Sequence, residues 1–260
     1  MTPLARRAHE VRYRIAAACA RARRDPASVT LVAVSKTVAA ASVREAMGAG
    51  LAVFGENRVQ EALAKIPEVP AAARWHLVGH LQSNKAKQAV GAFELIHSVD
   101  DAELAAELDR RAATRGLVQP VLVQANLSGE STKSGVDEPA VMPLLEAVAA
   151  CPHLALRGLM TVPPPVADPE ESRPWFVRLR ALRDRAAERL GRPLPELSMG
   201  DDRRFRGGHR GGRDPRSRRA GDLRRARLRG RPAGTYRIQR ISCNAGGPGL
   251  CFAVLRRNSG

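Results

Sequence analysis

Lys36 directly follows residues 30–35, an apolar run that is typical of a buried β-strand. An ammonium group is costly to bury, so a lysine in this place must be paired, reach solvent or hold a ligand. A lysine with a lowered pKa attacks an aldehyde and forms a Schiff base with it. The alternative is a lysine that only extends from the strand end into a loop, and the strand by itself favours that interpretation. The choice between the two depends on the rest of the chain.

The carboxyl ends of the later apolar runs also carry residues of interest. These residues are Glu56-Asn57, Gly79-His80, His97-Ser98, Asn126, Met160-Thr161 and Ser198-Met199-Gly200. If the runs are parallel strands of a barrel, their carboxyl ends meet at one face, where barrel enzymes hold their chemistry. We therefore expect one site at that face, with Lys36 in it.

The elements that must position this site alternate along the chain. We expect strands at residues 30–35, 52–54, 75–78, 93–97, 121–126, 154–160 and 197–199. Helical segments separate them at intervals of roughly 25–30 residues, a rhythm that predicts repeated right-handed βαβ units. No Gly-x-Gly-x-x-Gly motif is present, which favours a barrel over a dinucleotide-binding sheet. The sequence therefore predicts an α/β fold, a (β/α)8 TIM-type barrel in which seven strands are recognisable.

Capping residues mark the starts of several expected helices. Thr2 precedes a proline and is suited to cap the first helix. Asn57, with Gln60 three residues later, has the pattern of a capping box, and so has Asp100 with Glu103. We therefore expect helices to begin directly after Asn57 and Asp100.

Length and composition limit the class of protein. The 260 residues suit one large domain or two small ones. No apolar run approaches the ~18 residues that span a bilayer, and no secretory signal segment is recognisable. We therefore expect a soluble, cytoplasmic protein without membrane contact. The four cysteines are far apart or in unlike contexts, so we expect neither a disulfide framework nor a metal site.

The positive charge is concentrated at one end of the chain. The formal net charge is +17, and residues 201–260 contribute +13 of it through 17 arginines and four acids. Residues 1–200 therefore carry only +4. A basic balance is typical of nucleic-acid binding, but here it does not extend to the body of the protein.

Seven short motifs occur in a fixed order. They are Val34-Ser35-Lys36-Thr37, the segment 55–61, the segment 75–85, His97-Ser98-Val99-Asp100, Lys133-Ser134-Gly135, Gly158-Leu159-Met160 and Leu197-Ser198-Met199-Gly200. With them, about residues 5–200 resemble the pyridoxal phosphate homeostasis proteins, single-domain relatives of the alanine racemase barrel. The second domain that supplies an opposing catalytic base in alanine racemases has no counterpart in this sequence. His80 replaces a proline that is common in the family.

The resemblance implies a barrel that binds pyridoxal 5′-phosphate (PLP) as a Schiff base on Lys36. It also implies that Asn57 is a hydrogen-bond partner beside the ring, that Ser198 and Gly200 are part of a phosphate cradle, and that Met160 packs beside the ring. Each has a plainer interpretation: a helix cap for Asn57, a strand-to-helix turn for Ser198 and Gly200, and simple core for Met160. The implied role is a PLP carrier or buffer, expected to be a monomer, that supplies PLP-dependent apo-enzymes without established turnover.

Two other functions remain open at this point. The first is a PLP-dependent enzyme such as an amino-acid racemase. Racemisation needs an acid/base residue on the ring face opposite Lys36, and the sequence identifies none. The second is nucleic-acid binding by residues 201–232 as an arginine-rich arm, which would depend steeply on salt.

After Gly200 the chain departs from the family pattern. The family continues with an acidic turn, a helix and an eighth strand, whereas residues 201–230 show no apolar periodicity and no strand. Read one nucleotide later with permitted GC-rich codons, this stretch yields an acidic turn, an amphipathic helix and a strand, so we hypothesise a frameshift. The expected organisation is then a PLP-binding barrel at 1–200 and a disordered or out-of-frame tail at 201–260.

Loss of the eighth strand has a physical consequence. It would leave the first and seventh strands with unpaired edges, which favour aggregation. The arginine that faces the pyridine nitrogen in the family has no matching position here, so we assign that role to no residue. We expect weak PLP retention and poor solubility.

Overall fold

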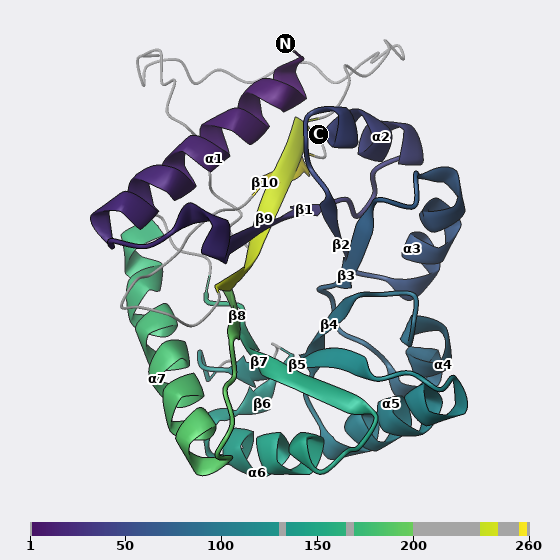
Figure 1. Cartoon of the computed structure of the whole chain (residues 1–260), viewed down its shortest axis with the longest axis vertical. Coiled ribbons are helices and arrows are strands. Elements are labelled where there is room, and N and C mark those ends of the chain that lie inside the picture. Colours follow the sequence, from purple (N-terminus) through teal and green to yellow (C-terminus); the bar gives the residue numbers. More distant parts are fainter. Residues whose placement is uncertain (1, 130–133, 165–168, 200–234, 244–254, 259–260) are drawn as a thin grey trace, which may run out of the picture.

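Seven parallel strands curl around the centre of the protein, and the helices that follow the strands lie outside them (Figure 1). The computed structural model describes residues 2–129, 134–164, 169–199, 235–243 and 255–258. The parallel strands are β1 (Val29–Val34), β2 (Val53–Glu56), β3 (Arg74–Leu77), β4 (Leu95–Val99), β5 (Gln119–Asn126), β7 (Leu154–Thr161) and β8 (Glu196–Met199). Each pairs in parallel with the next in this series. The seven strands expected from the sequence are confirmed, and with them the alternation of parallel strands and helices that is typical of a barrel.

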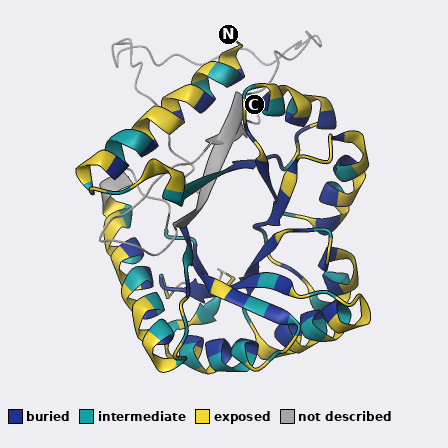
Figure 2. Cartoon of the chain, viewed as in Figure 1, coloured by how far each residue is buried: buried dark blue, intermediate teal, exposed yellow. Residues whose placement is uncertain are grey.

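The helices cover the outer face of these strands. They are α1 (Pro3–Arg21), α2 (Ala40–Gly48), α3 (Val59–Lys65), α4 (Ala86–Ala89), α5 (Ala102–Thr114), α6 (Glu138–Ala149) and α7 (Arg173–Arg189). Short 3-10 turns occur at Pro26–Ser28, Ile66–Glu68, Ser83–Lys85 and Pro169–Ser172, and the two-residue strand β6 (Val136–Asp137) pairs with β5. Each helix turns a buried side toward the strands and an exposed side outward (Figure 2). None of the helices in the described part of the chain is long and apolar enough to cross a membrane.

Two of the three expected helix caps are displaced by one residue. Thr2 caps α1 as expected, because its Oγ1 accepts from the amide of Ala5 at 3.2 Å. At α5 the cap is Asp101 rather than Asp100, since the Asp101 carboxylate accepts from the amide of Leu104 at 2.6 Å. At α3 the N-cap is Arg58, which makes no side-chain capping bond, so the expected capping box at Asn57 is wrong.

Alternate strand residues belong to two different cores. Ala33, Phe54 and Trp75 belong to the large core that also includes the buried faces of the helices. Val32, Val34, Val53 and Val78 form a separate cluster on the other side of the same strands. Because side chains of a strand alternate between its faces, this second cluster lies in the barrel interior. Successive residues of each strand therefore face the helices and the interior in turn.

Two C-terminal strands correct the expectation of an unpaired first strand. β9 (Thr235–Cys243) pairs antiparallel with β1, and β10 (Leu255–Asn258) pairs with β9. β9 lies beside both β1 and β8 (Figure 1). Its direction differs from that of a true eighth strand, because all strands of a (β/α)8 barrel are parallel. Of the two expected edges, that of β1 is therefore covered, whereas β8 pairs only with β7 among the described strands. The expectations for residues 201–234 lie outside the described residues.

Candidate functional site

Lys36 lies in a tight turn at the carboxyl end of β1. The amide of the preceding residue, Ser35, donates to the carbonyl of Gly55 at 2.9 Å, which ties the turn to β2. The following residue, Thr37, has φ of +59°, a conformation that L-residues seldom adopt. Lys36 is half-buried and comes two positions after Val34, which faces the barrel interior. Lys36 therefore lies directly beyond the carboxyl end of β1, at the carboxyl face of the barrel.

A buried network of charged groups lies behind this turn, on the helix side of β2. Glu56 is fully buried and accepts from Ser35 Oγ at 2.6 Å and from Lys65 Nζ at 2.8 Å. Lys65 Nζ also donates to the Ser35 carbonyl at 2.7 Å and to Glu61 Oε1 at 2.8 Å. Sequence reasoning missed this network. The available signal was a carboxylate, Glu56, at the end of an otherwise apolar strand.

The network distinguishes the two lysines near the end of β1. An ammonium group has three protons to donate. Lys65 Nζ donates to three acceptors and is nearly fully buried, so it keeps no lone pair for attack on an aldehyde. Lys65 is therefore a poor candidate for covalent chemistry at this face.

Burial dominates the electrostatics of the Glu56 carboxylate. Desolvation raises the pKa of Glu56, and the hydrogen bonds from Lys65 and Ser35 oppose that rise. Burying one charge alone would be very unfavourable, whereas a hydrogen-bonded pair compensates much of the desolvation. Glu56 and Lys65 thus require each other.

Asn57 and Gly79 are in close backbone contact at the ends of β2 and β3. A Cβ added to Gly79 would lie 2.4 Å from the carbonyl oxygen of Asn57, nearer than any real contact. Gly79 is therefore required by this close backbone approach, because a larger residue would clash with Asn57. Asn57 is half-buried at the carboxyl face, next to the β1 turn.

Met160 and Ser198 are register partners in the neighbouring strands β7 and β8. Met160 is buried and packs with Leu95 and Leu122 in the barrel interior, so it is part of the core there. Ser198 is fully buried, and its Oγ has no hydrogen-bond partner among the described residues. Because buried hydroxyls are normally hydrogen-bonded, Ser198 is suited to donate to a ligand oxygen such as that of a phosphate. Gly200 lies outside the described residues.

The candidate residues therefore lie in two pairs at one face of the barrel. Lys36 and Asn57 follow β1 and β2, and Met160 and Ser198 lie at the ends of β7 and β8. An amine, an unsatisfied hydroxyl and an apolar wall fit a small aldehyde that carries a phosphate. No group of three or more metal-ligating side chains occurs within the described ranges.

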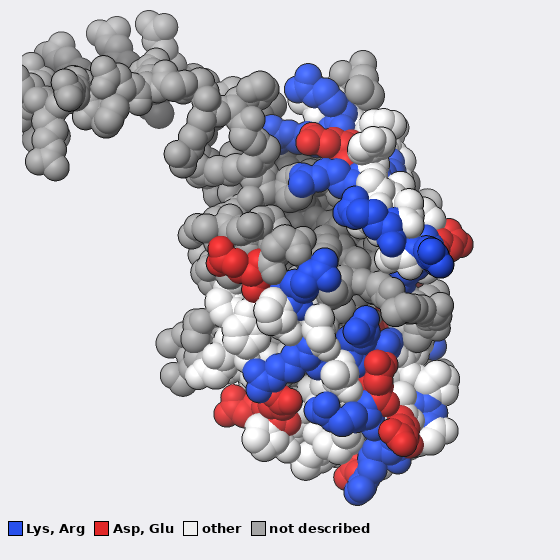
Figure 3. Space-filling view, turned by 90° about the vertical axis from the view of Figure 1, so that its left-hand side faces the viewer, with Lys and Arg blue, Asp and Glu red and all other residues white. Residues whose placement is uncertain are grey.

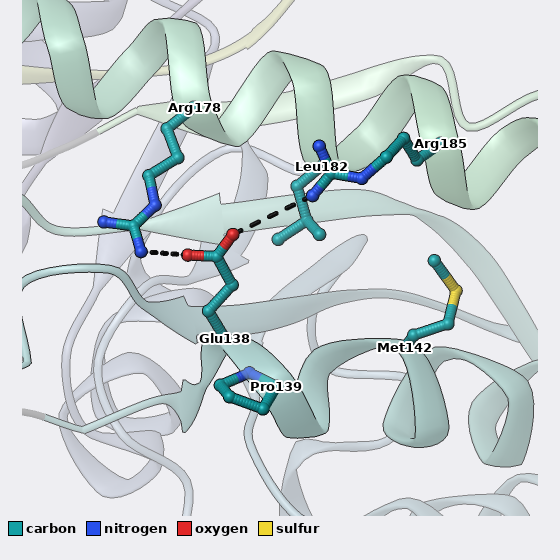
Figure 4. Close-up of a pocket in the computed structure, with 6 residues that line it drawn as sticks. All are labelled: Glu138, Pro139, Met142, Arg178, Leu182 and Arg185. Atoms are coloured by element: carbon teal, nitrogen blue, oxygen red, sulfur yellow. Dashed lines mark ion pairs between the residues drawn. The ribbon is translucent and has the colours of Figure 1, made fainter.

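The outer surface offers a hollow that is separate from this face. It has a volume of about 530 Å³ and lies between α6 and α7, with Met142 and Leu182 among its lining residues (Figure 4). The carboxylate of Glu138 pairs with Arg178 and, at 3.8 Å, with Arg185. The one carboxylate and the two guanidinium groups leave a formal net charge of +1 on these three lining residues. Acidic and basic side chains are interspersed over this side of the molecule as a whole (Figure 3), unlike the uniform basic surface expected for nucleic-acid binding.

A family model described as "Alanine racemase, N-terminal domain" matches residues 8–201. Parallel strands with outer helices, and a lysine at the end of the first strand, define the class as a barrel of this type. The alanine racemase of Streptomyces coelicolor A3(2) shares the fold. Its TM-score is 0.55 at 20% identity, and the matched region covers 73% of this chain and 51% of the racemase.

More similar proteins specify the family. A pyridoxal phosphate homeostasis protein of Aquifex aeolicus is 43% identical over 195 residues, 75% of this chain and 86% of the relative. PipY of Synechococcus elongatus PCC7942, solved with PLP bound, superposes with a TM-score of 0.64 at 38% identity, covering 73% of this chain and 88% of its own. An unknown protein from Bifidobacterium adolescentis gives a TM-score of 0.70 at 36% identity over 76% and 85% of the two chains. The chain belongs to the family of pyridoxal phosphate homeostasis proteins.

Proposed function

We propose that this protein binds PLP through Lys36 and acts as a carrier or buffer of PLP in the cell. The observation that carries the proposal is the placement of Lys36. It is half-buried and directly follows the carboxyl end of β1, in a turn that the amide of Ser35 ties to β2. The PLP-bound relative PipY supports the choice of ligand.

The residues of the site have separate roles in this proposal. PLP supplies an aldehyde that condenses reversibly with an amine, a phosphate dianion and an aromatic ring. Lys36 provides the amine, and Asn57 bonds to the ring from the neighbouring strand end. Ser198 donates to the phosphate together with the amides near Gly200, and Met160 supplies apolar contact beside the ring.

Cellular role and organisation are part of the same proposal. The protein acts as a cytoplasmic monomer, and PLP-dependent apo-enzymes receive PLP from it. Residues 1–200 form the PLP-binding body, and residues 201–260 are read out of frame. The racemase alternative requires an acid/base residue opposite Lys36, and we assign none among the described residues. Incubation with alanine in deuterium oxide tests it, because turnover would exchange the α-hydrogen.

Borohydride reduction followed by peptide mapping tests the assignment of the amine. The chain has five lysines, at positions 36, 65, 85, 87 and 133. With PLP below one equivalent, we expect the reduced label on Lys36 alone. Label on Lys65, Lys85 or Lys87 would overturn the assignment of the Schiff-base lysine. The same reduction with pyridoxal, which has no phosphate, should label more slowly.

A further inference from the structure

We propose that Glu61 and Lys65 of α3 are positioning residues that set the direction of the Lys36 amine by holding both chain neighbours of Lys36. The inference rests on the proposed function, because Lys36 is the residue that these two are argued to position. We place neither Glu61 nor Lys65 in contact with PLP.

On the C-terminal side of Lys36, a carboxylate of α3 holds the backbone. The amide of Thr37 donates to Glu61 Oε1. Thr37 has φ of +59°, and a β-branched residue in this region is strained. Such a conformation persists only where the surroundings impose it. Glu61 supplies that constraint through a charge-assisted hydrogen bond.

On the N-terminal side, all three polar groups of Ser35 are occupied. Its carbonyl accepts from Lys65 Nζ at 2.7 Å, and its hydroxyl donates to Glu56 at 2.6 Å. Its amide donates to the carbonyl of Gly55 at 2.9 Å. Ser35 is therefore fixed to both β2 and α3, and it is itself almost fully buried.

The two attachments belong to one unit. Lys65 Nζ lies 2.8 Å from Glu61 Oε1, the oxygen that also accepts from Thr37, and the two residues are one helical turn apart. The side chain of Lys65 is only 10% exposed, so this ion pair is weakly screened. A shift of α3 would move both neighbours of Lys36 together. The backbone of Lys36 is thus held on both sides.

A purely structural role makes a different prediction. A buried ion pair that only stabilises the fold would change unfolding when removed, with no effect on covalent chemistry at Lys36 in the folded protein. A positioning role predicts slower adduct formation at Lys36 without loss of phosphate binding, because misplacement of a reacting group lowers its rate.

Three variants separate these possibilities. Glu61→Ala removes the acceptor, Glu61→Gln keeps an acceptor oxygen for Thr37, and Glu94→Ala removes a carboxylate that pairs with Arg74 instead, beside the amino ends of β3 and β4. Hydrogen exchange of the Thr37 amide is measured in the protein without PLP. The initial rate of borohydride-trapped label on Lys36 is measured with PLP, and inorganic phosphate serves as competitor.

We expect Glu61→Ala to raise exchange at Thr37 and to slow labelling of Lys36 about tenfold, with unchanged competition by phosphate. Glu61→Gln should recover most of the rate, and Glu94→Ala should match the parent protein. Labelling of Glu61→Ala at the parent rate would overturn the inference and leave the proposed function intact. Absence of label on Lys36 in the parent protein would instead overturn the proposed function.

A shorter acid provides the comparison if Glu61→Ala does not fold. In Glu61→Asp the carboxylate remains charged, but the shorter side chain cannot accept from both the Thr37 amide and Lys65 Nζ. Slower labelling of Lys36 in this variant is the expected result, and an unchanged rate would overturn the inference.

Discussion

His97 Nε2 lies 3.1 Å from His76 Nδ1 inside the barrel, with the two ring centroids 5.1 Å apart. One nitrogen of this pair donates and the other accepts, so the hydrogen bond requires at least one neutral ring. Burial lowers the pKa of His76 to about 4 and that of His97 well below its usual range. The nearby His76 lowers the pKa of His97 further, because two adjacent positive charges repel.

This pair predicts acid lability of the fold. Well above pH 6.5 both rings are neutral whether the chain is folded or not, and their titration does not change the free energy of unfolding. As the pH falls from about 6.5 to about 4, the unfolded chain binds protons that the folded chain does not bind, so the free energy of unfolding falls. For His76 alone the loss amounts to about 3 kcal/mol. Urea unfolding at a series of pH values measures it.

His76→Gln provides the matched variant for that experiment. The glutamine cannot gain a charge, so the free energy of unfolding should fall less between pH 6.5 and pH 4 than in the parent protein, even if the variant is less stable at pH 7. An equal slope in both proteins would show that the buried pair does not cause the acid sensitivity.

Ser198→Ala separates ligand binding from stability. The Ser198 hydroxyl is buried without a partner among the described residues, so its removal should leave the free energy of unfolding unchanged or slightly raised. Loss of a hydrogen bond to a charged phosphate should weaken PLP binding about tenfold or more. Binding of pyridoxal should not change, and Ser172→Ala at the start of α7 should bind both like the parent. Equal weakening for PLP and pyridoxal would contradict a phosphate contact.

Gly79→Ala tests the contact between the ends of β2 and β3. The new Cβ would meet the backbone of Asn57 at 2.4 Å, so the strand ends must move apart. We expect a loss of about 1–3 kcal/mol in the free energy of unfolding, with weaker PLP binding through displacement of Asn57. Gly48→Ala is the control, because nothing lies within 4 Å of a Cβ at the end of α2, and it should stabilise by about 0.4–1 kcal/mol. Thermal unfolding of both variants measures these two changes in stability.

The sequence predicted those features that depend on local pattern. Short apolar runs located all seven parallel strands, because strands that are covered on both faces are apolar almost throughout. The end of the first run placed Lys36 at the carboxyl face. The caps at Asn57 and Asp100 were misplaced, since neighbouring residues compete for the same cap position and tertiary contacts choose between them.

Features that depend on contacts distant in the sequence could not be predicted. The bonds of Lys65 to Glu56 and to the Ser35 carbonyl join three elements, and no local pattern reports such a match. The sequence leaves Met160 between a ligand contact and the core, and the structure places it with Leu95 and Leu122 in the core of the barrel interior. β9 was missed because its arginine-rich surroundings lack strand periodicity.

The hypothesis of a frameshift has its own test. Resequencing the gene around codon 200 should reveal an extra nucleotide. The chain with the corrected frame should keep PLP through gel filtration better than the present chain does, because it regains the family's eighth strand and phosphate contacts. Identical retention by the two chains would contradict the expected loss.

The pairing of β9 with β1 predicts that the C-terminal residues protect one edge of β1. Val29 is the register partner of Cys243, and Val32 is that of Gln239, so β9 covers the edge of β1 that faces away from β2. A chain that ends at residue 234 would leave that edge unpaired, and its β1 amides should exchange faster with deuterium, while those of β3 keep their protection from both neighbours. The shortened chain should also aggregate more readily, because an uncovered strand edge accepts another chain. Equal exchange of the β1 amides in both chains would show that β9 does not protect this edge in solution.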